Sequence, residues 1–100
     1  MEKRHQERKA VSNLVVEISS GHGLYSGIVK NISYSGLLID GVPPEVTHRG
    51  EIFNLTVLSK GQNYRLRAIP RWVCGNDRNK LFNLKIFSVP RNWFQFVDSL

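Results

Sequence analysis

Short apolar segments separated by turn-forming residues follow one another along most of this chain. The segments recur at intervals of roughly 8–12 residues, a spacing typical of sandwiches and barrels, with turns such as Ser20-Gly21-His22-Gly23 between them. This pattern predicts strands over residues 11–19, 24–33, 36–40, 51–59, 64–74 and 81–87. Because the strands are short and their connections brief, we expect an all-β fold, a small six-stranded antiparallel β-barrel.

The fifth predicted strand shows the clearest alternation. Leu66 and the apolar residues two positions away fall on one face, whereas Arg65 and Arg67 fall on the other. Pro70 interrupts this strand and cannot donate a ladder hydrogen bond, so we expect a bulge or a strand edge there. The pattern predicts a strand with one apolar and one basic face.

The last segment changes from strand spacing to helix spacing. Trp93, Phe96, Val97 and Leu100 recur at i, i+3, i+4 and i+7, which places them on one face of a helix. Pro90 suits the first turn of such a helix. We therefore expect a C-terminal helix over residues 89–100 that covers the barrel.

The composition fits one globular domain with a basic character. Of the 100 residues, 41% are hydrophobic and 22% are charged. Residues 1–10 hold several Lys and Arg and almost nothing apolar, which predicts a mobile basic arm before a barrel over residues 11–88. The formal net charge of +6 predicts an anionic partner, which on composition alone is a nucleotide, a nucleic acid or an acidic membrane surface.

Several functional classes find no support in the sequence. Cys74 is the single cysteine and is expected in the core, Trp72 and Trp93 are expected in the core or in the helical lid, and the three histidines lack metal-ligand spacing. We therefore expect no metal and no cofactor. No catalytic motif is present, so we do not expect an enzyme. The lack of a membrane span or a secretory signal favours a cytoplasmic protein.

Two short motifs carry the chemistry of this chain. Arg4 and Arg8 form an R-x-x-x-R, and Asn31, Ser33 and Gly36 form an N-x-S-x-x-G between two predicted strands. A guanidinium can bind phosphate oxygens or a guanine edge bidentately and can stack on a base. The Asn31 amide suits a guanine edge, Ser33 adds a hydroxyl, and Gly36 allows either positive φ or close approach of a ligand to the backbone. The same residues are also compatible with a solvated basic arm and a simple Asx turn.

In this order, with a strand and a turn between them, the two motifs resemble those of the PilZ family, bacterial receptors for the second messenger cyclic di-GMP. The resemblance covers essentially the whole chain, since six strands and a C-terminal helix follow the family's barrel. It implies that cyclic di-GMP is bound by Arg4, Arg8, Asn31, Ser33 and Gly36, with Lys3 and Ser35 as further candidates. One departure is Asn83, which replaces a glycine that many members of the family have near the start of the last strand.

The resemblance also implies how such a protein works. Ligand binding would order the N-terminal arm, which gains bonds to the two phosphates only in the bound state, and the changed surface would signal to a protein partner. Two alternatives stay open: a basic β-barrel that binds single-stranded nucleic acid, and a degenerate PilZ-like module that docks a protein without a nucleotide. Nucleic acid is the less favoured partner, because Phe and Tyr mostly fall on apolar strand faces.

Overall fold

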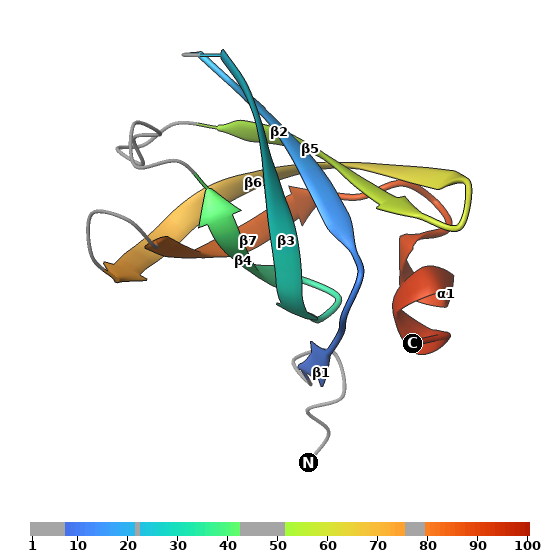
Figure 1. Cartoon of the computed structure of the whole chain (residues 1–100). Coiled ribbons are helices and arrows are strands. Elements are labelled where there is room, and N and C mark those ends of the chain that lie inside the picture. Colours follow the sequence, from blue (N-terminus) through green and yellow to red (C-terminus); the bar gives the residue numbers. More distant parts are fainter. Residues whose placement is uncertain (1–7, 22, 43–51, 76–79) are drawn as a thin grey trace.

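The computed structural model describes residues 8–21, 23–42, 52–75 and 80–100, with the backbone alone described at 72–75 and 80. Seven strands and one helix make up this part of the chain (Figure 1). In chain order they are β1 (Lys9–Ala10), β2 (Val15–Ser20), β3 (Gly23–Ile32), β4 (Gly36–Val42), β5 (Phe53–Ser59), β6 (Gln62–Gly75), β7 (Lys80–Ser88) and α1 (Trp93–Asp98).

Strands β2 to β7 form a closed antiparallel barrel. Hydrogen-bonded neighbours follow the order β1-β3-β2-β5-β6-β7-β4, and an additional pairing of β3 with β4 closes the ring. Figure 1 shows β2 and β3 crossing over β6 and β7, with α1 beside one end of the barrel. The predicted fold, a six-stranded antiparallel β-barrel with a C-terminal helix, is confirmed, and β1 is an additional short strand.

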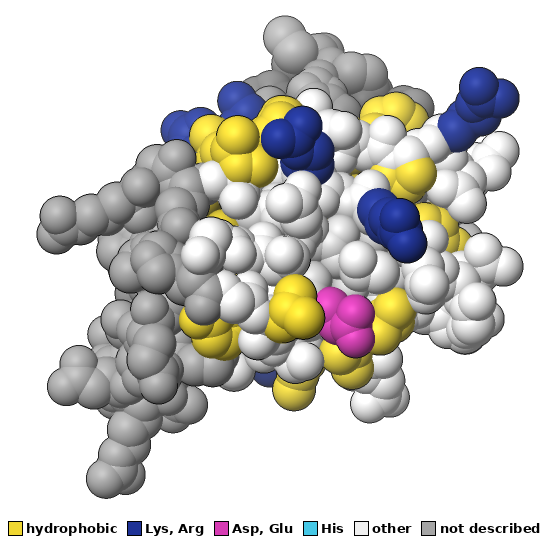
Figure 2. Space-filling model, turned by 90° about the horizontal axis from the view of Figure 1, so that it is seen from above, with side chains coloured by type: hydrophobic (Ala, Val, Ile, Leu, Met, Phe, Trp, Pro, Cys, Tyr) yellow, Lys and Arg dark blue, Asp and Glu magenta, His cyan; other side chains and the backbone are white. Residues whose placement is uncertain are grey.

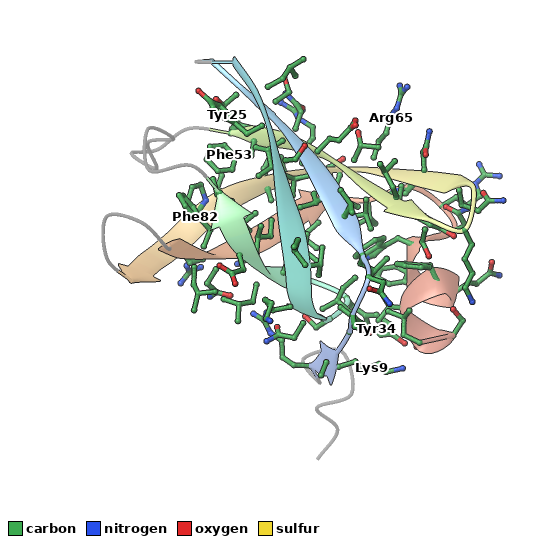
Figure 3. All side chains as sticks on the ribbon, in the orientation of Figure 1. Lys9, Tyr25, Tyr34, Phe53, Arg65 and Phe82 are labelled. Carbon is green, nitrogen blue, oxygen red and sulfur yellow. The ribbon has the colours of Figure 1, made fainter. Side chains whose placement is uncertain are left out.

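Alternation along the strands fills the barrel with apolar side chains. On β2, Val16 and Ile18 are buried, whereas Glu17 between them is exposed. Phe53 and Phe82 point into the interior from β5 and β7, with their ring centroids 6.3 Å apart (Figure 3). Each Å² of apolar surface removed from water stabilises the fold by about 25 cal/mol, so this closed interior is the main stabilising feature.

The start of the barrel differs from the prediction. The strand expected over residues 11–19 begins only at Val15, because Asn13 has a φ of 62° and bends the chain. Asn adopts this left-handed conformation more readily than most residues. Before the bend, Lys9 pairs with Ile32 and Ala10 with Asn31. Residues 9 and 10 therefore belong to the sheet and not to a free arm, and residues 1–7 lie outside the described residues.

Two irregularities shape the later strands. The pairing of β6 with β7 shifts between Pro70 and Trp72, which confirms the bulge expected at the proline. The strand expected over residues 36–40 continues to Val42, because a shift in register between Ile39 and Val42 includes Gly41 at a φ of 80°. The shift keeps Val42 buried in the core.

The C-terminal helix is shorter than predicted. It begins at Trp93 and ends at Asp98. Trp93, Phe96 and Val97 are buried against the barrel as expected, and Trp93 is fully buried. Because the helix ends before Leu100, that side chain leaves the apolar face and is 44% exposed.

The side chain of Cys74, expected in the core, and that of Trp72, expected in the core or in the helical lid, lie outside the described ones. Within the described ranges, no helix has the length and apolar character needed to cross a membrane. On the face in Figure 2, exposed hydrophobic side chains are scattered among polar ones and do not form one continuous patch.

Candidate ligand site

The guanidinium of Arg8 joins β3 and β7 across the face of β4. Its Nη1 donates to Oδ1 of Asn31 at 2.8 Å, and its Nη2 donates to Oδ1 of Asn83 at 3.0 Å. Asn31 and Asn83 are both register partners of Leu38, so they flank β4 in one row. A planar fork with five N–H donors suits two acceptors on either side of a strand. The fold thus brings together the two sequence motifs.

Gly36 leaves room for this guanidinium. A Cβ on Gly36 would lie 2.7 Å from Nη2 of Arg8 and 3.1 Å from its Cζ. Gly36 is not among the described glycines with positive φ. The expectation of positive φ is therefore wrong at this position. The other expected reason for glycine, close approach of a ligand to the backbone, stays a prediction, and the group that approaches Gly36 in this structure is the Arg8 guanidinium.

The loop between β3 and β4 is fixed by backbone hydrogen bonds. The Ser33 amide donates to the Gly36 carbonyl, and the Ile86 amide donates to the Ser35 carbonyl, each at 2.9 Å. The first bond closes the loop and the second attaches it to β7. Ser33 is only 2% exposed, whereas Ser35 is exposed. Of the two serines, Ser35 is therefore the more accessible to a ligand in this conformation.

A hollow of about 300 Å³ lies beside Arg8. Its lining consists of three cations and three other residues: Arg8, Arg71, Lys85, Ser35, Asn83 and Leu84. On the β6–β7 ladder, Pro70 pairs with Leu84 and Ile69 with Lys85. This pairing places Arg71 and Lys85 in the same hollow as the motif residue Arg8. Because the lining combines cations with an amide and contains no carboxylate, it favours an anion that also has hydrogen-bonding edges.

Arg8 contributes a permanent positive charge to this hollow. Burial lowers the pKa of the Arg8 guanidinium from its ordinary value, because desolvation disfavours the charged form. An arginine nevertheless stays protonated in proteins. A partly desolvated cation also attracts an anion more strongly than one in bulk water. Lys3 and Arg4 lie outside the described residues, so the structure places one of the two motif arginines.

The comparison with known families agrees with this geometry. The family model described as the PilZ domain matches residues 2–95. The chain belongs to the PilZ domain family. The resemblance carried by the two sequence motifs is therefore confirmed.

A solved structure shares the fold of this PilZ domain. This is the structure of the Bacillus subtilis inhibitor of motility, MotI (DgrA), to which this chain is similar with a TM-score of 0.73 and 16% sequence identity. The match covers 90% of this chain and 44% of the MotI chain, so this chain spans less than half the length of that protein. At this identity the likeness establishes the fold alone. The sequence matches none of the curated proteins with which it was compared.

In this PilZ domain, residues next to both motifs contact α1. Lys9, which follows the second motif arginine, donates from Nζ to the Val97 carbonyl at 3.0 Å. Tyr34, inside the N-x-S-x-x-G loop, donates its hydroxyl to Oδ1 of Asp98 and accepts at its carbonyl from Nε1 of Trp93 at 2.9 Å. Figure 3 shows Lys9 and Tyr34 on the side of the barrel that α1 covers. The motif segments and the helix therefore form one connected unit.

Three residues of the site were missed by sequence reasoning. Arg71 and Lys85 line the hollow, but only the register between β6 and β7 reveals this, and single-sequence patterns do not specify that register. Asn83 drew notice only as a departure from the family pattern. Its polar side chain was the available signal, because the amide oxygen can accept a hydrogen bond from Arg8, which a glycine at this position could not do.

Proposed function

We propose that this PilZ domain is a bacterial receptor for cyclic di-GMP that passes the signal to a protein partner. The observation that supports this most is the hollow in which Arg8, held by Asn31 and Asn83, lies with Arg71 and Lys85. Cyclic di-GMP combines two negative charges with two guanines. Guanidinium groups bind phosphates and guanine edges, so one small site of this kind suits both parts of the ligand.

Each motif residue has a role in this proposal. Arg8 binds a phosphate or a guanine edge, and Arg4 and Lys3 join it from the N-terminal segment. Asn31 binds a guanine edge. Ser33 is buried and shapes the loop, so its hydroxyl reaches the ligand only if the loop moves, whereas the exposed Ser35 offers its hydroxyl directly. Gly36 keeps the backbone free of a side chain. No catalytic step and no cofactor is part of this role, which suits a cytoplasmic adaptor.

The signal would travel through α1. If Arg8 turns from its two amide partners toward a phosphate, the adjacent Lys9 moves with it, and its bond to the Val97 carbonyl changes. A ligand that contacts the loop around Tyr34 acts on the same helix through the bonds of Tyr34 to Asp98 and Trp93. A ligand shifts a conformation only by binding its states differently, and Arg8 supplies such a difference because its present partners are neutral amides.

Calorimetry tests the proposal directly. We expect cyclic di-GMP to bind in the micromolar range or tighter, which corresponds to about −8 kcal/mol, whereas cyclic di-AMP and GTP bind far more weakly. Arg8→Ala should weaken binding about tenfold or more, since hydrogen bonds to charged groups contribute about 1.5–3 kcal/mol. Arg71→Ala and Lys85→Ala should each weaken it, because both cations line the hollow. The proposal would be refuted if calorimetry detected no heat and NMR detected no chemical-shift changes of the backbone amides at high ligand concentration.

A further inference from the structure

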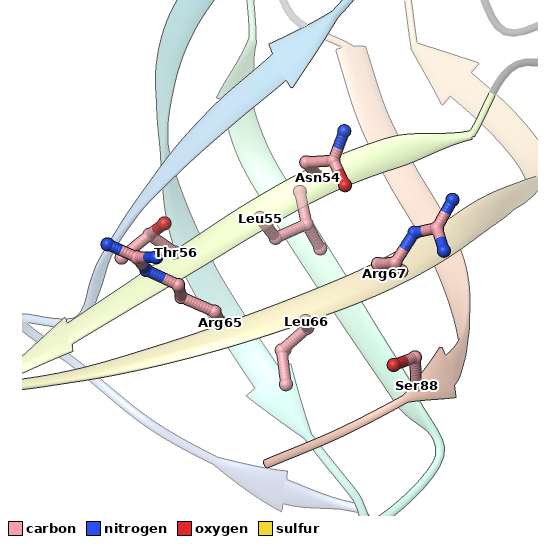
Figure 4. A pocket seen from close by; sticks show the side chains of 7 residues that line it. All are labelled: Asn54, Leu55, Thr56, Arg65, Leu66, Arg67 and Ser88. Carbon is pink, nitrogen blue, oxygen red and sulfur yellow. The ribbon is translucent and has the colours of Figure 1, made fainter.

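A second basic surface lies on the outer face of β5 and β6, apart from the motif residues. It is a hollow of about 420 Å³ between these strands and the end of β7 (Figure 4). Arg65 and Arg67 line it together with Asn54, Thr56 and Ser88. The side chains of Leu55 and Leu66 are buried in the core, so these two residues contribute backbone atoms to the floor of the hollow. We refer to this hollow as the β5–β6 groove.

The arginines of the β5–β6 groove have neutral cross-strand neighbours. Thr56 is the register partner of Arg65, and Asn54 is the partner of Arg67. On the other side of Arg67, β7 contributes Ser88. The sequences of β5, β6 and β7 contain no Asp or Glu at all. Opposite-charge pairs on neighbouring strands are what neutralise charge within a sheet. Arg67 has no carboxylate beside it on these three strands, whereas Arg65 shares a cross-strand row with Thr56 and with the exposed Glu17 of β2.

Arg67 is held in place by an exposed aromatic ring. Its Cζ lies 5.5 Å from the ring centroid of Phe87, which is 49% exposed. This cation–π contact restrains a side chain that would otherwise lose considerable rotamer entropy on binding. Arginine and aromatic residues are also the types that most often anchor protein interfaces. The pair therefore provides a preformed anchor at one end of the groove.

The spacing of the two arginines indicates what binds there. Arg65 and Arg67 are two residues apart on one strand face, so their backbone positions repeat about every 6.7 Å. An extended peptide with acidic residues at alternate positions presents carboxylates with the same repeat. Single-stranded nucleic acid would require several free aromatic faces for base stacking. None of the residues that line the groove is aromatic, and the Arg67 guanidinium already lies over the nearby ring of Phe87.

We propose that the β5–β6 groove is a docking surface for an extended acidic segment of a protein partner. This inference shares with the proposed function only the idea that a protein partner exists, and it names the surface and the chemistry of that partner. The groove and the candidate nucleotide site lie on the same β6–β7 ribbon, since Arg71 follows Arg67 by about 13 Å of extended chain. They use different residues, so the two sites can be tested separately.

The test uses a fluorescein-labelled peptide of alternating Glu and Ser, with alternating Gln and Ser as the control peptide. Fluorescence anisotropy at low and at physiological salt should detect binding of the acidic peptide alone. The double variant Arg65→Gln/Arg67→Gln should bind about tenfold more weakly or worse. The conservative variant Arg65→Lys/Arg67→Lys should lose less, because it keeps the charge but not the bidentate fork. The matched control Lys30→Gln/Arg91→Gln removes two exposed cations elsewhere and should change binding by no more than about twofold.

Three results would overturn this inference: no binding of the acidic peptide, an equal loss in the matched control, or displacement of the peptide by oligo-dT that binds more tightly. The last result would make the groove a nucleic-acid surface. Calorimetry with cyclic di-GMP on the same variants separates the two proposals. Arg65→Gln/Arg67→Gln should leave the affinity for cyclic di-GMP unchanged. If the wild-type domain bound the peptide but not the nucleotide, the proposed function would fail while the docking surface would stand.

Discussion

Arg8 occupies the space that a side chain on residue 36 would fill, since a Cβ on Gly36 would lie 2.7 Å from its Nη2. The two residues belong to different motifs, and the glycine of one motif is needed for the arginine of the other. The backbone at Gly36 imposes no such requirement, because its φ is not positive. This relationship explains in physical terms why the two motifs belong together.

Gly36→Ala should weaken ligand binding with little effect on the fold. The methyl group pushes away the flexible end of Arg8 and not a rigid neighbour. We expect the free energy of unfolding to change by less than about 1 kcal/mol, and the affinity for cyclic di-GMP to fall about tenfold, or about 1.4 kcal/mol. Chemical denaturation and calorimetry give the two quantities.

The double variant Arg8→Ala/Gly36→Ala is the control for this mechanism. If the alanine at residue 36 acts only by displacing Arg8, it should not weaken ligand binding further once Arg8 has been removed. The effects of the two substitutions on affinity should then be strongly non-additive. Fully additive losses would mean that Gly36 contacts the ligand independently of Arg8.

Much of the barrel could be predicted from alternation. Arg65 and Leu66 show why: one side chain faces water and the next faces the core, and a period of two records that difference in the sequence. The bulge at Pro70 was predictable for a similar reason, because proline lacks an amide donor. By contrast, β1 consists of Lys9 and Ala10 alone, and two residues carry no period. The bend at Asn13 before β2 was likewise hidden, since an asparagine in an apolar segment does not by itself reveal its φ.

The candidate site was only half predictable. Arg8 and Asn31 carry a recognisable motif, and the structure joins them by a hydrogen bond. Asn83 enters the site because it shares the register partner Leu38 with Asn31. That coincidence depends on which strands neighbour β4 and on where their ladders begin. The periodicity of a single sequence contains neither piece of information, so the sequence alone identifies Asn83 as a departure from the family pattern and not as a residue of the site.

Asn83→Asp should replace the neutral group that accepts a hydrogen bond from Arg8 by a carboxylate that competes with the ligand for this guanidinium. The carboxylate has the shape of the amide and forms a charge-assisted bond to Nη2, so the fold is retained. It also places a negative charge in the hollow that should receive a dianion. We expect cyclic di-GMP binding to weaken about tenfold or more, whereas Asn83→Ala should have a smaller effect. Calorimetry decides the matter, and equal losses in the two variants would contradict this role of charge.

Lys9→Met should loosen α1 while keeping most of the side chain's length. The ammonium donates to the Val97 carbonyl near the end of the helix, where a cation is favoured by the exposed carbonyls and the helix dipole. We expect a loss of about 0.5–1.5 kcal/mol in the free energy of unfolding and faster amide exchange within α1. Lys30→Met, on the exposed face of β3, is the matched control and should stay within about 0.5 kcal/mol. Equal exchange rates in both variants would mean that Lys9 does not restrain the helix.

The indole of Trp93 should report ligand binding. It is buried and donates to the Tyr34 carbonyl inside the motif loop, so a ligand that moves the loop changes this bond. We expect the Trp93 indole N–H resonance to shift on addition of cyclic di-GMP, and Tyr34→Phe to reduce that shift because it removes the bond to Asp98. An unchanged resonance at saturation would exclude α1 as the route of the signal.

Arg8→Lys should make ligand binding more sensitive to alkaline pH than it is in the native domain. Burial already lowers the pKa of the Arg8 guanidinium, but an arginine remains charged throughout the accessible range. A lysine begins from a pKa of about 10.4, and the same desolvation lowers it further. Its positive charge is therefore kept at low pH and is lost as pH rises through the lowered pKa. We expect the variant's affinity for cyclic di-GMP to begin to fall at a lower pH than that of the native domain, in which Arg8 stays charged, as measured by calorimetry across pH. Parallel pH profiles for the two proteins would show that the charge at residue 8 is not what the ligand recognises.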